Sequence, residues 1–124
     1  MAKLIYNDKI YTSFFNAVDR YVMLDRQVSI ALSSPRSYKG SHCRLLAPTP
    51  ELLKGYKNGE ITKEQYEVIY YETTLALLNP LEIYEMLKGK VLLCWEKKGV
   101  FCHRHLVIRW LRDNLGEGVI GGEL

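Results

Sequence analysis

The sequence has no long apolar run, no low-complexity tract and only three cysteines among its 124 residues. No stretch approaches the roughly 20 apolar residues that cross a membrane, so we expect no membrane partner. No long apolar region follows the first six residues, so we expect no secretory leader and a cytoplasmic location. An odd cysteine count without a leader is typical of a reducing compartment, and we therefore predict free thiols and no disulfide framework.

The charged residues form no run of one sign. The net charge is +3, and the basic residues are interleaved with acidic ones. This mild excess is compatible with an anionic ligand but too weak to indicate a nucleic acid, which we do not expect as a partner. The length and the 48% apolar content indicate one domain over residues 1–124. A homo-oligomer is compatible with these data.

Segments rich in β-branched and aromatic residues predict strands at 9–15, 27–32 and 91–95. Residues 15–24 have unevenly spaced apolar positions and predict a short helix or turn. Residues 117–124 are rich in glycine and predict either a flexible tail or an edge strand.

Helix start signals recur between the second and third predicted strands. Thr49 precedes a proline, Thr62 is followed by Gln65 in a capping box, and Asn79 precedes a second proline. We expect helices over 51–56, 62–78 and 80–88, and another from about 103 until Gly116. Strands separated by helices predict an α/β fold, a small three-layer, Rossmann-like sandwich with a short, mostly parallel sheet.

Open α/β sheets bind ligands at the carboxyl ends of their strands. Thr12 and Ser13 lie near the end of the first predicted strand, and the loop 33–39, with Arg36 and Lys39, follows the second. We expect these residues to share one edge with segment 94–104.

Segment 91–111 concentrates the candidate chemistry. A cysteine at a helix start is favoured as thiolate by the helix dipole and by a neighbouring arginine, here Arg104. Cys102 is therefore the candidate nucleophile, with Cys94 as second choice, His103 as base or acid, and Glu96 orienting the imidazole. The same helix start can equally bind an anion without covalent chemistry.

Spacing argues against two other sites. His103 and His105 are two residues apart and point to opposite sides of a helix, and adjacent Cys102 and His103 are poorly spaced to ligate one ion. We therefore predict no metal and no cofactor. Arg104 is also too close to Cys102 for the five-residue cradle of a tyrosine-phosphatase loop.

The run LLCWEKKGVFCHRHLVIRWL at 92–111 resembles the LLC-x-EK…CHR signature of domain-of-unknown-function family 488. Segments 10–14, 28–31, 38–40, 46–49 and 53–59 resemble its short phage and bacterial branch, so the likeness covers nearly the whole chain. One departure is that the family usually has an arginine directly after the second strand, whereas Arg36 comes later here. The resemblance implies the α/β fold but no reaction, and it marks as motif residues Cys94, Glu96, Cys102, His103 and Arg104.

These patterns predict a small domain that binds an anionic, nucleotide-like or phosphorylated ligand. The residues expected to contact that ligand are Arg104, Arg36, Lys39, Thr12 and Ser13. One alternative is a thiol-dependent enzyme that uses Cys102 and His103 on such a ligand. Another is a non-catalytic module that sequesters a nucleotide signal. A third is a protein-interaction module whose contact surface would be the tyrosine-rich helix with Tyr66, Tyr70 and Tyr71.

Overall fold

The computed structural model describes residues 8–18, 24–96 and 100–124. These residues form a five-stranded, all-parallel sheet with the strand order β3-β2-β4-β1-β5. The strands are β1 (Ile10–Phe14), β2 (Gln27–Ser29), β3 (Ser41–His42), β4 (Val91–Cys94) and β5 (Ile120–Glu123).

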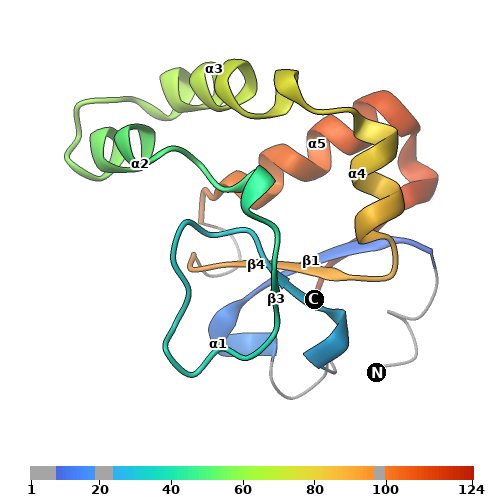
Figure 1. Cartoon of the computed structure of the whole chain (residues 1–124). Coiled ribbons are helices and arrows are strands. Elements are labelled where there is room, and N and C mark those ends of the chain that lie inside the picture. Colours follow the sequence, from blue (N-terminus) through green and yellow to red (C-terminus); the bar gives the residue numbers. More distant parts are fainter. Residues whose placement is uncertain (1–7, 19–23, 97–99) are drawn as a thin grey trace.

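Four helices cover one face of the sheet, and a short helix lies on the opposite side (Figure 1). The covering helices are α2 (Pro50–Lys57), α3 (Lys63–Thr73), α4 (Pro80–Leu87) and α5 (His103–Leu115), and the short one is α1 (Phe15–Val18). This arrangement confirms the predicted α/β fold with a parallel sheet. Part of the helix or turn predicted at 15–24, residues 19–23, lies outside the described residues. None of the described helices has the length and apolar character needed to span a bilayer.

The residues predicted to cap the helices occupy the N-cap positions of α2, α3 and α4. Thr49 Oγ1 accepts a hydrogen bond from the Leu52 amide at 3.2 Å, and Thr62 with Gln65 forms the complete capping box. Asn79 Oδ1 accepts from the first-turn amides of α4. Helix α3 ends at Thr73, before the expected 78, and a 3-10 turn (Leu75–Leu77) follows it. At that end the Thr73 hydroxyl donates to the Ile69 carbonyl at 2.7 Å, a bond that favours bending of a helix.

Strand β4 is the centre of the sheet, with each of its residues no more than 1% exposed. It pairs in parallel with β1 and β2, so the carboxyl ends of these three strands meet on one edge. The strand predicted at 27–32 is shorter in the structure, because only Gln27–Ser29 pair as β2. Residues 120–123 form the edge strand β5 beside β1.

Candidate functional site

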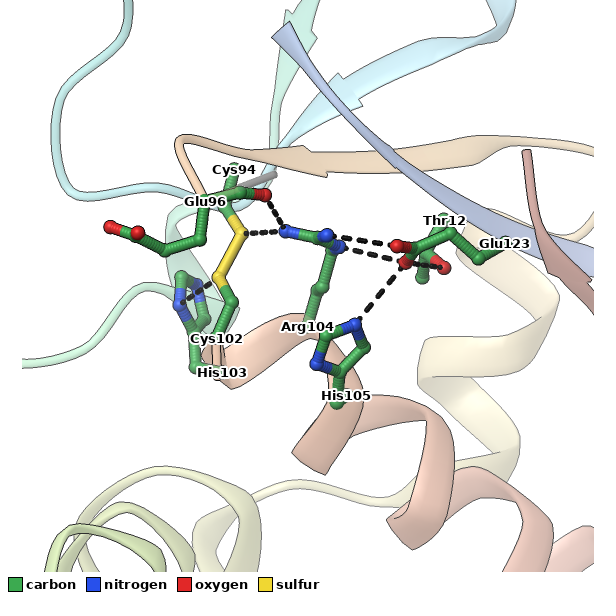
Figure 2. Close-up of polar contacts among 8 residues, drawn as sticks. All are labelled: Thr12, Cys94, Glu96, Cys102, His103, Arg104, His105 and Glu123. Carbon is green, nitrogen blue, oxygen red and sulfur yellow. Dashed lines mark hydrogen bonds and ion pairs between the residues drawn. A yellow bond between two sulfur atoms is a disulfide. The ribbon is translucent and has the colours of Figure 1, made fainter. Parts of the chain in front are cut away.

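Cys94 and Cys102 are joined by a disulfide at the carboxyl end of β4 (Figure 2). The two residues are eight apart in sequence and are 1% and 6% exposed. The prediction of free thiols is therefore wrong for this pair and holds for Cys43, which is buried and free. Cysteine count and compartment do not predict this bond, because it depends on the fold bringing the end of β4 next to the start of α5. The predicted nucleophile Cys102 is thus a thiol only after reduction.

The imidazole of His103 lies against the disulfide. Its Nε2 is 2.7 Å from the Ile30 carbonyl oxygen, which only accepts, so Nε2 carries the proton and Nδ1 is left bare in the neutral ring. Nδ1 lies 3.6 Å from Cys102 Sγ. Burial lowers the pKa of His103 to about 4, so the ring is neutral at pH 7. The ring is oriented by donating to the Ile30 carbonyl oxygen, and not by the Glu96 carboxylate, which was the group expected.

Arg104 is fully buried between the disulfide and β5 (Figure 2). Its Nε and Nη2 donate to the two carboxylate oxygens of Glu123 at 2.9 and 3.0 Å, in a bidentate pair. Its Nη1 donates to Cys94 Sγ at 3.0 Å and to the Glu96 carbonyl oxygen at 2.6 Å. The charge expected to neutralise a ligand is therefore compensated within the protein.

Glu123 is the main polar residue that the sequence analysis missed. Its carboxylate also accepts from the Thr12 hydroxyl at 2.9 Å and lies 3.3 Å from His105 Nε2. Burial alone would raise the pKa of this carboxyl. Hydrogen bonds from Arg104 and Thr12, with the charges of Arg104 and His105, outweigh burial and lower the pKa to about 2. Thr12, predicted to bind ligand, here holds the ion pair.

A cavity of about 540 Å³, which we call the cysteine pocket, lies at the carboxyl ends of β2 and β4. The disulfide and His103 line it together with eight residues of α2, α3 and the segment between them, among them Leu53, Ile61 and Tyr66. Three rings on its wall stack edge to face, with centroids 5.2–5.5 Å apart, and these are Tyr56, Tyr66 and Phe101.

The positive charge at the cysteine pocket comes from residues that the sequence analysis did not select. Lys57 and Lys63 line it, and both are exposed at the turn between α2 and α3. Lys63 Nζ lies 5.3 Å above the Phe101 ring. No local pattern marks these lysines, because single lysines are common at solvated helix ends.

The other predicted ligand residues lie elsewhere. Lys39 lines a separate hollow of about 320 Å³ beside Phe15 and Tyr38, and Arg36 is exposed in the same loop. Ser13 is buried in β1. Of the predicted site residues, the cysteine pocket brings together Cys94, Glu96, Cys102 and His103.

No family model, no curated protein and no solved structure matches this chain. The resemblance to family 488 therefore stays a prediction.

Proposed function

We propose that this chain binds a small organic anion, nucleotide-like or phosphorylated, in the cysteine pocket. The observation that carries the proposal is a cavity of about 540 Å³ at the carboxyl ends of parallel strands, lined by an aromatic trio and two lysines. Cavities of roughly 300–1,000 Å³ in this position are typical ligand sites in α/β folds.

The lining suits a planar, negatively charged ligand. Tyr56, Tyr66 and Phe101 give the pocket an aromatic wall for apolar contact, while Lys57 and Lys63 supply charge at the α2–α3 side. The lysines take the neutralising role that the sequence analysis gave to Arg104, whose charge is paired with Glu123.

A thermal-shift series tests this proposal. The probes are adenosine and guanosine 5′-monophosphates, inorganic phosphate and the uncharged nucleosides. A probe at 100 times its Kd should stabilise the protein by about 2.7 kcal/mol, and the uncharged nucleosides should do so less.

Two variants complete the test. The double variant Lys57→Ala/Lys63→Ala should lose the shift, whereas Lys54→Ala, an exposed lysine on α2 outside the pocket, should keep it. The proposal fails if none of the anions shifts the melting temperature, or if the double variant responds like the parent.

A second candidate, a thiol-dependent enzyme, is supported by the partners of the two sulfurs. After reduction, the bare Nδ1 of His103 can accept a hydrogen bond from the Cys102 thiol, and Arg104 can stabilise a Cys94 thiolate. As the Cys102 sulfur attacks an electrophilic centre of a ligand in the pocket, its proton would pass to His103 Nδ1 and then to the group that leaves with the electron pair of the broken bond.

Alkylation with iodoacetamide tests this candidate, with the protein reduced beforehand. Cys43 is a matched internal control, because Cys43 and Cys102 are 5% and 6% exposed. Cys102 should react much faster than Cys43 at neutral pH, and His103→Gln should remove most of the difference. Equal, slow labelling of both thiols would rule out an activated Cys102.

A further inference from the structure

We propose that the reduced protein binds a zinc-class divalent cation through Cys94 Sγ, Cys102 Sγ and His103 Nδ1. The three donor atoms lie within 4.8 Å of one another, and all three residues are buried. Thiolate sulfur and imidazole nitrogen are the ligands that zinc prefers. The site goes beyond anion binding and needs no anion to form.

The distances suit a tetrahedral ion. Zn–S bonds of about 2.3 Å and Zn–N bonds of about 2.0–2.1 Å place neighbouring ligand atoms about 3.5–3.8 Å apart. Cys102 Sγ and His103 Nδ1 are already 3.6 Å apart. Reduction of the disulfide frees Cys94 Sγ to move into the third ligand position.

Adjacent residues can share one ion here because of the backbone between them. Cys102 has an extended conformation, with φ −152° and ψ 150°, and His103 is the first residue of α5. The junction of extended and helical backbone turns both side chains toward the end of β4 (Figure 2). Adjacent Cys102 and His103 were predicted to be poorly spaced to ligate one ion, but the change of backbone conformation at this helix start brings Cys102 Sγ and His103 Nδ1 within 3.6 Å of each other.

The surroundings of the three ligands are those of a metal site. The His103 Nε2–H group donates to the Ile30 carbonyl oxygen at 2.7 Å, the kind of outer hydrogen bond that fixes the tautomer of ligating histidines. Arg104 Nη1 donates to Cys94 Sγ, which favours the thiolate. The charges of two thiolates and one divalent cation sum to zero. The charges of Arg104 and Glu123 also cancel, so no net charge is buried.

The fourth coordination position would face the cysteine pocket. All three ligands line that pocket, and within the described ranges 8–18, 24–96 and 100–124 no fourth histidine, cysteine or carboxylate joins the cluster. Three protein ligands with one open position are typical of reactive zinc sites, and closed structural sites have four.

Loading of the site is coupled to oxidation state. A phosphine reductant and one water convert the disulfide into two thiols and become the phosphine oxide. Metal binding then releases the two thiol protons. In the oxidised protein the sulfur lone pairs belong to a disulfide, which is a poor zinc ligand.

Cobalt substitution tests the site directly. The full chain is reduced with tris(2-carboxyethyl)phosphine, desalted without oxygen and titrated with Co²⁺, and Zn²⁺ affinity is then measured by competition. We expect one equivalent to bind, with thiolate-to-cobalt charge transfer and the visible bands of a tetrahedral ion. The oxidised protein, which requires no substitution, should show neither signal.

Variants separate this cluster from other thiols. Cys43→Ser should retain full binding, whereas His103→Gln should weaken it by more than about 100-fold. Circular dichroism of each variant checks that the fold is kept. The proposal is overturned if the reduced protein gives no charge-transfer band, if the oxidised protein binds equally well, or if Cys43→Ser abolishes the signal.

Discussion

The first turn of α5 has two sides with opposite character, and two histidines mark them. His103 is 7% exposed, neutral and in contact with the disulfide, and it lines the cysteine pocket. The side chain of His105 is 39% exposed and faces the Glu123 carboxylate next to β5. One side therefore carries a neutral imidazole beside the disulfide, where we propose ligand chemistry, and the other carries an ion pair that ties α5 to the edge of the sheet. Residue types alone do not separate these roles, because both sides come from consecutive positions.

Glu123→Gln would remove the ion pair between Arg104 and Glu123, and we expect it to have the largest effect on the unfolding free energy. It leaves the guanidinium of Arg104, which is fully buried, without its counter-charge, and we expect a loss of about 3–5 kcal/mol in unfolding free energy. Urea denaturation measures this loss. Glu117→Gln is the matched control, since its pair with Arg112 is exposed and worth about 0–1 kcal/mol. Similar losses in both variants would mean that the buried pair does not hold β5.

As the pH falls, protonation of His103 should destabilise the folded protein before protonation of Glu123 does. The pKa of His103 is about 4 in the folded protein against 6.5 in the unfolded chain, so protons bind preferentially to the unfolded state. This destabilisation develops as pH falls from about 6.5 to about 4 and amounts to as much as about 3 kcal/mol. The pKa of Glu123 is about 2 against 4.5, so its contribution is complete above 4.5 and is lost between about 4.5 and 2.

Urea denaturation across this pH range distinguishes the two groups. His103→Gln should flatten the dependence between pH 6.5 and 4, whereas His42→Gln, a substitution of an exposed histidine, should leave it unchanged. An unaltered slope in His103→Gln would show that the ring does not stay neutral in the folded state.

The sequence predicted the features of this fold whose causes are local. Thr49, Thr62 and Asn79 cap their helices as expected, since each cap depends on residues within three positions. The strands β1 and β4 follow from their own composition. The two-residue strand β3 (Ser41–His42) was missed, because pairing with β2 defines it and its composition does not.

The part of the candidate site that lies in one short segment was predicted, and the part that depends on tertiary packing was not. The motif located Cys94, Cys102 and His103, which lie on one pocket wall. The partner of Arg104 is 19 residues away in a glycine-rich segment, and only the pairing of β5 with β1 brings it near. Lys57 and Lys63 reach the pocket through the packing of α2 and α3, which no short pattern encodes.

Thr12→Val, which also changes the surroundings of Glu123, should have an intermediate effect on the unfolding free energy. Valine suits a strand and preserves the shape of the side chain, but it removes the hydroxyl that donates to Glu123 Oε1 at 2.9 Å. Because this hydrogen bond is made to a buried charged group, we expect a loss of about 1.5–3 kcal/mol in unfolding free energy. Thr73→Val is the control, since its hydroxyl bonds a helix carbonyl at an exposed position. A loss no greater than that of the control would exclude Thr12 from the network.

His105→Gln should have the smallest effect, and it sharpens the contrast between the two histidines. Glutamine keeps a donor that can reach Glu123, and the side chain at this position is more than a third exposed. We therefore expect a change within about 0.5 kcal/mol at neutral pH. The same substitution at His103 removes a buried ring that hydrogen-bonds the Ile30 carbonyl oxygen at 2.7 Å, so we expect a larger loss there. If the two substitutions cost the same, the first turn of α5 would not be divided, and the assignment of reactive chemistry to the His103 side would lose its basis.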